Sequence, residues 1–276
     1  MKSTGAAEPS TTASEPAAVP SPPIQGRARQ VLVRIGNFLF TWRNEVFPLS
    51  FLAIAAASHP LAPFGSERAD LVMDAVGLGI ALAGQALRAA VIGLAYIQRG
   101  GKGKKIHADS LVQDGLFAHS RNPLYLGNMM VFLGLFIVLN SYLGYLVGVP
   151  FFLLAYLSIT FAEEEFLRKQ FGLVYVEYFR RVNRFFPSPQ GLGATMRSMS
   201  FHWRRLVRKE YGSTFTWMTT AMALLIWEKA ARHGWHSVGP RVYVLAPLWA
   251  LTIAGYALAR YLKKTGRLRD APIATP

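Results

Sequence analysis

Six long apolar segments run through this 276-residue sequence, and they restrict its fold more than any other feature. A helix needs roughly 20 mostly apolar residues to cross about 30 Å of hydrocarbon. Because each membrane-embedded segment must satisfy its own backbone hydrogen bonds, helices are favoured. We therefore expect an all-α fold, a polytopic transmembrane helical bundle of about six spans with a short cytosolic helical cap. The spans are predicted near residues 46–64, 71–97, 123–139, 142–162, 214–231 and 242–261.

The distribution of charge supports this interpretation and gives it a direction. The net charge of +15 comes from 30 Lys and Arg residues against 15 Asp and Glu residues. With a cytoplasmic N-terminus, 25 of the basic residues fall in predicted inside segments or at the span ends next to them, and four fall in outside segments or at the span ends next to them, while Arg88 falls well within a span. Cytoplasmic segments of membrane proteins collect Lys and Arg. The sequence thus predicts a multi-pass protein among membrane lipids, with both termini cytoplasmic and no nucleic-acid partner.

Two classes of site are excluded or disfavoured by composition. The chain has no cysteine, which excludes disulfides, thiolate metal sites and a cysteine nucleophile. Its six histidines form no metal-binding pattern, so no metal site is expected. The run Gly100–Lys105 lacks the spacing of a phosphate-binding loop and is interpreted as a flexible basic loop.

The segment Gly115–Gly127 is too unusual for a plain loop. Pro123 suits the first turn of the third span, and Asn122 is then its expected N-cap. Arg121 and the helix N-terminus together attract an anion such as a carboxylate. Tyr125 and Gly127 lie one turn further on, where a ring and a close backbone approach can frame a ligand. The alternative is a capped helix with an interfacial arginine and tyrosine.

A second unusual segment, Glu163–Pro187, begins where the fourth span leaves the membrane. Three consecutive glutamates at 163–165 are disfavoured at a helix C-terminus by the helix dipole, so a cationic ligand or nearby arginines must compensate them. Beyond Gly172, an i, i+3, i+4, i+7 pattern predicts one apolar helix face, made by Tyr175, Tyr178, Phe179 and Val182. The alternative is an amphipathic helix that lies on the membrane.

These two segments resemble the paired motifs of the isoprenylcysteine carboxyl methyltransferase and phospholipid methyltransferase family. The family reads Arg-His-Pro-x-Tyr-x-Gly, then Glu-Glu-x-x-Leu-x-x-x-Phe-Gly-x-x-Tyr-x-x-Tyr-x-x-x-Val-x-Arg-x-x-Pro. The matching positions begin with Arg121-Asn-Pro-Leu-Tyr-Leu-Gly127 and continue with Glu163, Glu164, Leu167, Phe171, Gly172, Tyr175, Tyr178, Val182, Arg184 and Pro187. Asn122 stands where the family usually has histidine. The resemblance covers roughly residues 111–187.

The resemblance implies a membrane methyltransferase that uses S-adenosylmethionine on the cytosolic side of the bundle. It implies catalytic roles for Glu163, Glu164 and Arg184. The residues expected to bind the cofactor are His119, Arg121, Asn122, Pro123, Tyr125, Gly127, Glu163, Glu164, Tyr175 and Tyr178. Arg184 and the intramembrane Arg88 are expected at the substrate, although Arg88 can also be a snorkelling side chain. An amine acceptor would need a base, for which Glu163, Glu164 or His119 is available.

The acceptor and two rival functions stay open at this point. The acceptor is expected to be lipidic or hydrophobic: a prenylcysteine carboxylate, a phospholipid amine, or a small thiol or phenol. The first rival is an NADPH-dependent membrane reductase of the sterol type, which would need contacts for a dinucleotide. The second is a membrane scaffold or transporter without enzymatic activity.

With this function in view, composition divides the chain into four parts. Residues 1–25, rich in Pro, Ala, Ser and Thr, are expected to form a disordered tail. Residues 26–45 are expected to form an interfacial basic helix, and 46–190 a membrane methyltransferase core. Residues 191–276 are expected to contain a basic interfacial segment and two further transmembrane helices, for which the resemblance offers no account.

Overall fold

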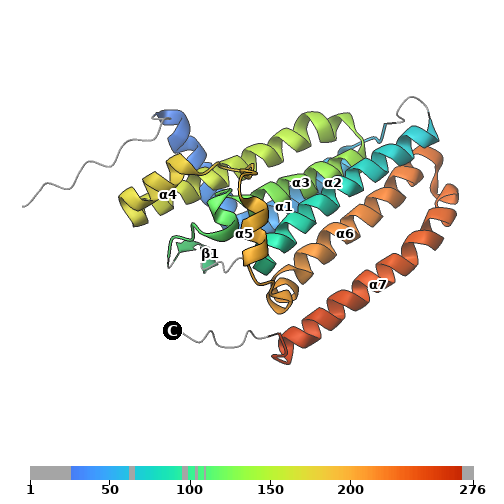
Figure 1. Cartoon of the computed structure of the whole chain (residues 1–276). Coiled ribbons are helices and arrows are strands. Elements are labelled where there is room, and N and C mark those ends of the chain that lie inside the picture. Colours follow the sequence, from blue (N-terminus) through green and yellow to red (C-terminus); the bar gives the residue numbers. More distant parts are fainter. Residues whose placement is uncertain (1–25, 62–65, 95–98, 103–104, 109, 269–276) are drawn as a thin grey trace, which may run out of the picture.

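The computed structural model describes residues 26–61, 66–94, 99–102, 105–108 and 110–268 as a bundle of long helices (Figure 1). The predicted tail, residues 1–25, lies outside the described residues. The helices are α1 (Arg27–Ala57), α2 (Glu67–Leu94), α3 (Pro123–Leu139), α4 (Val149–Arg181), α5 (Leu192–Ser198), α6 (Trp203–His233) and α7 (Gly239–Lys264). A π-helical turn, η3 (Gly144–Gly148), leads directly into α4, while the 3₁₀ turns η2 (Gly115–Ala118) and η4 (Trp235–Ser237) precede α3 and α7. The predicted all-helical architecture is confirmed in these parts of the chain.

Among the residues that the structure describes, three helices are long and apolar enough to cross a membrane, namely α2, the continuous helix Gly144–Arg181 and α7. Helix α3 is apolar but has only 17 residues. Helices α1 and α6 have 31 residues each and carry more charge along their lengths. The membrane character of the bundle is thus supported, while the count of six spans stays a prediction.

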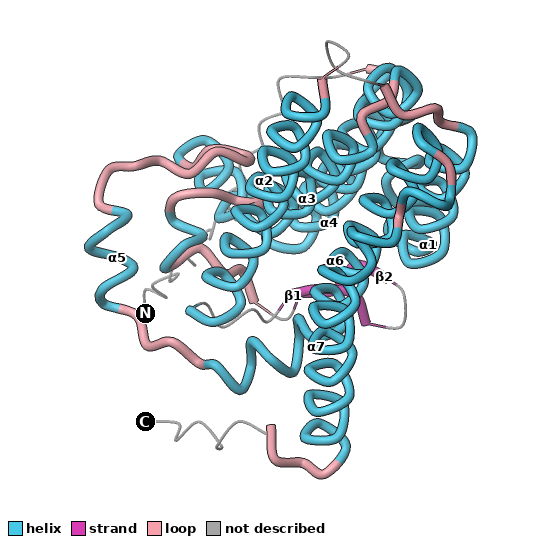
Figure 2. Tube along the Cα trace, turned by 90° about the vertical axis from the view of Figure 1, so that its right-hand side faces the viewer, coloured by secondary structure: helices cyan, strands magenta, loops and turns pink. Residues whose placement is uncertain are grey.

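The antiparallel helices bring the segments predicted to be cytoplasmic to one end of the bundle. In Figure 1 this is the left-hand end, where α1 begins, α4 ends and α5 lies. Helix α5 lies in front of the long helices in Figure 1, and the turned view of Figure 2 shows it to one side of them. The connections α3–α4 and α6–α7 lie at the opposite end. Successive connections therefore lie at alternating ends of the bundle, as the distribution of basic residues predicts.

One element departs from the expected all-helical fold. Strands β1 (Arg99–Lys102) and β2 (Lys105–Ala108) pair antiparallel, with Gly101 opposite Ile106, in the segment that the sequence had suggested as a flexible basic loop. Ile106 packs against the main apolar core, and the Ala108 carbonyl accepts a 2.6 Å hydrogen bond from the Gln170 side chain. These anchors explain why the segment is ordered as a hairpin.

Helices α2 and α3 approach each other along a seam of glycines. Gly77 lies against Gly134, and Gly84 lies against Gly127, with backbone carbonyls in the space that a side chain would fill. Helices in lipid gain no hydrophobic free energy by associating, so van der Waals packing between them matters more. Small residues allow the close approach that such packing requires. Gly144 and Gly148 form a second small face, which packs on Phe136 of α3.

Replacing Gly84 with leucine should destabilise the bundle, because a Cβ there would lie 2.6 Å from the Gly127 carbonyl oxygen. Overpacking of this kind typically costs about 1–3 kcal/mol. Gly79→Leu is the matched control on the same helix, since a Cβ at Gly79 meets nothing within 4 Å. Unfolding in mixed detergent micelles should show a lower midpoint for Gly84→Leu only. Equal midpoints for both variants would show that α2 and α3 are not packed as described.

Candidate active site

The two motif segments lie side by side and are joined through their backbones. The Arg121 amide donates to the Asn183 carbonyl at 2.9 Å, and the Asn122 amide donates to the Arg184 carbonyl at 3.0 Å. A few residues away, the Ser188 amide donates to the His119 carbonyl at 3.0 Å. Segments more than 60 positions apart in the sequence are thus held in register at the entrance to α3, as their joint match to one family had suggested.

Glu164 of α4 is the centre of the charged cluster that this pairing creates. Its carboxylate accepts a 2.9 Å hydrogen bond from Arg121 Nη2 and bonds of 3.0 and 2.9 Å from Arg184 Nε and Nη2. The carboxylate of Glu164 and the guanidinium of Arg121 are almost fully buried, with side chains 5% and 6% exposed, whereas Arg184 is 27% exposed. Nearby arginines therefore compensate the glutamate that looked misplaced in the sequence, and Arg184 is the member that a ligand reaches most easily.

Both arginines are fixed by further contacts. Arg121 Nη1 donates to the carbonyls of Phe179 and, at 2.8 Å, Val182, and its guanidinium lies 4.1 Å from the centroid of the Phe179 ring. The Arg184 guanidinium lies 4.6 Å from the centroid of the Phe161 ring. Cation–π contacts hold a planar guanidinium in one orientation. Contacts within the protein therefore fix the orientation of both guanidiniums without a ligand.

Glu163 and Glu165, the neighbours of Glu164, have different partners. The Tyr125 hydroxyl donates to Glu163 at 2.7 Å, which brings together two predicted site residues from α3 and α4. Glu165 pairs with Arg29 of α1 at 2.6 Å, so the basic start of α1 is tied to α4. Glu164 and Glu165 are therefore compensated by arginines, whereas the half-buried Glu163 is bonded by the neutral Tyr125 hydroxyl within the part of the chain that the structure describes.

Asn122 and His119 serve the pairing of the two segments. Asn122 occupies the predicted N-cap position of α3 and Pro123 the first turn, but the Asn122 side chain makes no capping bond; its amide donates to the Arg184 carbonyl at 3.2 Å. The buried His119 ring lies 3.0 Å from the Ser188 carbonyl and 2.9 Å from the Thr195 hydroxyl. Because a carbonyl only accepts, Nδ1 of His119 must carry a proton.

Comparison with known families supports one interpretation of this part of the chain. Residues 75–173 match the phospholipid methyltransferase family. The predicted resemblance is confirmed over this phospholipid methyltransferase region, which is about a third of the chain and includes Arg121, Tyr125 and the three glutamates. The match and the apolar helices support a membrane methyltransferase. Searches of curated proteins and of solved structures found no match to the chain.

Tyr175 and Tyr178 follow the phospholipid methyltransferase region, and the apolar helix face predicted for them is buried within the protein. The apolar face that they form with Val182 does not lie at the membrane surface, because all three side chains are buried against Ala108 and neighbouring residues. The Tyr178 hydroxyl donates to the Phe117 carbonyl at 2.8 Å. The chain changes direction at Gly172, where φ is 56° and ψ is −129°. This turn folds the end of α4 back over the first motif segment, an interaction that periodicity alone does not reveal.

Arg88 and Gly127 lie on the α2–α3 side of the phospholipid methyltransferase region. Arg88 forms an ion pair with Glu210 of α6, a residue that the sequence analysis did not single out. Gly127 is the point where α2 approaches, since a Cβ there would lie 2.7 Å from Arg88 Cγ. The predicted close approach at Gly127 is therefore present, with a helix as the neighbour, and Arg88 is part of a protein ion pair.

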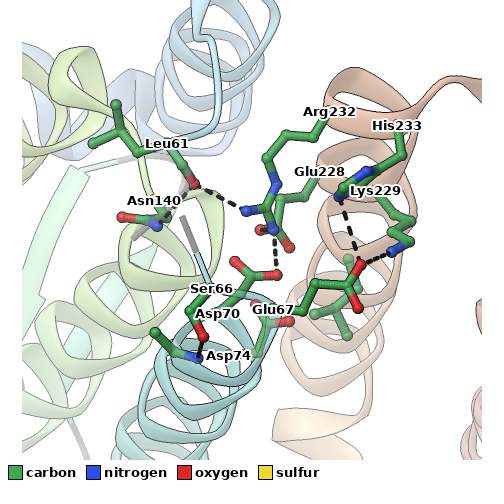
Figure 3. Close-up of polar contacts among 12 residues, drawn as sticks. Leu61, Ser66, Glu67, Asp70, Asp74, Asn140, Glu228, Lys229, Arg232 and His233 are labelled. Atoms are coloured by element: carbon green, nitrogen blue, oxygen red, sulfur yellow. Dashed lines mark hydrogen bonds and ion pairs between the residues drawn. The ribbon is translucent and has the colours of Figure 1, made fainter. Parts of the chain in front are cut away.

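A second charged cluster lies at the other end of the bundle, where α2 begins and α6 ends (Figure 3). Carboxylate oxygens of Asp70, Asp74 and Glu228 lie within 4.8 Å of one another, and all three residues are buried. The sequence analysis predicted no metal site and did not anticipate this group, because its members come from distant segments. Arg232 contacts Asp70 and Glu228, while Arg241 of α7 lies 3.2 Å from Glu228 and 3.6 Å from Asp74. We therefore interpret it as a buried ion-pair cluster that joins three helices.

Proposed function

We propose that the protein transfers a methyl group from S-adenosylmethionine to a lipidic or hydrophobic acceptor. The observation that carries the proposal is the docking of the two motif segments around Glu164, with Arg121 and Arg184 on either side. This arrangement unites residues inside and outside the phospholipid methyltransferase region in one charged centre. An ion pair kept only for stability would gain little over apolar packing, so its place in the motifs supports a binding role.

The residues present fit the chemistry of S-adenosylmethionine. Its carboxylate matches a guanidinium, and Arg184 is the more exposed of the two arginines. Its ammonium group matches a carboxylate, and the half-buried Glu163 is bonded by the neutral Tyr125 hydroxyl and not, among the described residues, by an arginine. Glu164, held by three guanidinium hydrogen bonds, is better suited to orient the arginines than to contact the ammonium group. His119 and Tyr178 would support the segments that carry these groups.

The bound cofactor supplies an electrophilic methyl group on a sulfonium. Methyl transfer is an in-line displacement, so the chain's main tasks are alignment and the exclusion of water. Arg184 and Glu163 would fix the two ends of the amino-acid portion. An ionised carboxylate or thiolate acceptor needs no base, whereas an amine would have to lose a proton, for which Glu163 is the best-placed group.

Direct binding separates the proposed function from its rivals. Purified protein in detergent should bind S-adenosylmethionine and its demethylated product by calorimetry, and it should not bind NADPH. Binding of NADPH alone would favour a reductase. Binding of neither compound would favour a scaffold or transporter. Methyl-labelled S-adenosylmethionine added to host membranes, followed by separation of lipids and proteins, would then identify the acceptor class.

Arg184→Ala should weaken cofactor binding and should also reduce turnover of an acidic lipidic acceptor when the cofactor is saturating. The guanidinium is partly exposed beside Glu164, so it can also contact an anionic head group. Kinetics with acceptors of graded chain length provide the measurement. Each buried methylene should contribute up to about 0.8 kcal/mol to acceptor binding. A flat kcat/KM across the series, with short soluble acceptors equally active, would show that the acceptor does not enter from the bilayer.

The placement of the site in the cytoplasm requires a defined topology. We expect reporter fusions at Gly101, Gly191 and the C-terminus to report a cytoplasmic location, and fusions at Ser66 and Gly234 an external one. The reason is the concentration of Lys and Arg in the first set of segments. An external signal at Gly191 would reverse the bundle and place the charged centre on the wrong side for a cytosolic cofactor.

A further inference from the structure

A polar network joins α6 to the phospholipid methyltransferase region deep inside the bundle. Arg88 of α2 donates to Glu210 of α6 through Nε at 2.9 Å and through Nη2 at 2.6 Å, which is a bidentate pair. Gln85 adds a 3.2 Å bond to the same carboxylate and accepts a 2.9 Å bond from the Trp217 indole. The remaining arginine nitrogen, Nη1, donates to the Asn128 side chain of α3. Three helices therefore meet at one guanidinium.

The burial of this pair makes Glu210 necessary for the position of Arg88. The two side chains are 13% and 5% exposed, and Arg88 lies on a helix that is apolar enough to span the membrane. A buried charge that loses its partner either moves to water or destabilises its surroundings. The bidentate geometry also fixes the plane of the guanidinium, which a single hydrogen bond does not. Glu210 thus determines where the Arg88 side chain lies.

The position of Arg88 in turn affects the start of α3. Its aliphatic stem fills the space above Gly127, and its guanidinium holds Asn128. These residues follow Tyr125 by one turn or less, and Tyr125 binds Glu163 in the candidate active site. The end of α3 that carries the site residues is consequently held on one side by Glu163 and on the other by Arg88.

We propose that Glu210 is a positioning residue of the active site, which holds Arg88 against Gly127 and Asn128 and so fixes the first turns of α3. The inference rests on the proposed function. It gives α6, which lies outside the phospholipid methyltransferase region, a role in that region's chemistry. The role is indirect, because Glu210 acts through Arg88 on the alignment of Tyr125 and Glu163.

The test compares Glu210→Gln with Glu210→Asp and with Glu67→Gln, a matched control whose side chain is 75% exposed at the other end of the bundle. The full-length protein in nanodiscs is given methyl-labelled S-adenosylmethionine and a lipid extract of host membranes. We expect Glu210→Gln to reduce the transfer rate per cofactor-binding site roughly ten- to a hundredfold, as a small misalignment does. The dissociation constant for the cofactor should change less, by about threefold at most, because Arg184 and Glu164 are not held by α6. Glu210→Asp should recover part of the rate.

Amide hydrogen exchange provides a readout that does not depend on the cofactor. The backbone amides of residues 124–128 should exchange faster in Glu210→Gln than in the wild-type protein. In Glu67→Gln they should exchange at the wild-type rate. Arg88→Gln combined with Glu210→Gln should be no worse than the poorer single variant, since both act through one pair. Wild-type exchange in Glu210→Gln, an unchanged rate per binding site, or independent losses in the double variant would each overturn the inference. If wild-type protein neither binds the cofactor nor transfers methyl groups, the proposed function fails, while exchange still decides whether Glu210 holds α3.

Discussion

Glu164→Leu should abolish most cofactor binding and also lower the free energy of unfolding by about 3–5 kcal/mol. The substitution leaves the Arg121 and Arg184 guanidiniums beside each other without the carboxylate that both now contact, and Arg121 is almost fully buried. Removing one partner of a buried ion pair costs this much because the other charge stays uncompensated. Glu164→Gln, which keeps the shape, should weaken S-adenosylmethionine binding roughly ten- to a hundredfold through the lost charge-assisted bonds. Denaturant unfolding and cofactor titration measure the two effects.

A combined variant separates the binding role of this cluster from its contribution to stability. In Arg121→Met/Glu164→Leu/Arg184→Met all three charges are replaced by apolar side chains, which often restores the stability of a protein. We expect this variant to unfold near the wild-type midpoint and yet to bind no S-adenosylmethionine. Glu177→Gln, an exposed site on the same helix, should leave both quantities unchanged. Cofactor binding by the combined variant would show that the cluster is only structural.

The parts of the fold that the sequence predicts well are those with a local signal. Long apolar segments and the alternation of basic residues predict the antiparallel helices and the end at which the basic segments gather. Pro123 predicts the start of α3 and Gly172 marks a change of direction, because both residues restrict or permit particular backbone angles. The number of membrane spans is harder to predict from the sequence. Helices α1 and α6 are long but carry charged residues, and the position of such residues in a membrane depends on the helices packed beside them.

The candidate site was predictable to the extent that two motifs had to converge. Their convergence placed Arg121, Glu164 and Arg184 together, and suggested that arginines compensate the glutamates. The partners inside the cluster were not predictable. Tyr178 follows a helical period that fits a membrane-facing helix equally well, and only the fold shows that its hydroxyl donates to the Phe117 carbonyl.

Pairs between distant helices were missed for a different reason. Glu210 stands in a basic segment and Asp70 near a predicted span end, where a lone carboxylate has no local signature. Their partners, Arg88 and Arg232, lie more than 100 positions away. Arg88 could be recognised as unusual because it interrupts an apolar segment, yet the sequence does not specify which of many carboxylates meets it.

Arg241→Met should loosen α7 from the bundle and cost about 3–5 kcal/mol of unfolding free energy. Arg241 reaches from α7 to the carboxylates of Asp74 and Glu228 and donates to the Leu225 carbonyl at 2.7 Å (Figure 3 shows their surroundings). Without it, three buried carboxylates share the single guanidinium of Arg232. Within α7 only Ala259 is buried, so little apolar contact compensates the loss.

The absence of native cysteine allows this prediction to be measured with spin labels at two introduced cysteines, replacing the exposed Ala231 of α6 and Val242 of α7. Arg241→Met should broaden the distance distribution between the labels. Arg241→Met/Asp74→Asn removes one carboxylate with the arginine, restores the balance of charge in the cluster, and should narrow the distribution again. Lys229→Gln is the control, because Lys229 pairs with the exposed Glu67, and exposed pairs contribute only about 0–1 kcal/mol. If Arg241→Met gives the wild-type distribution and midpoint, α7 is held by its contacts with α6 alone and the cluster does not join the helices.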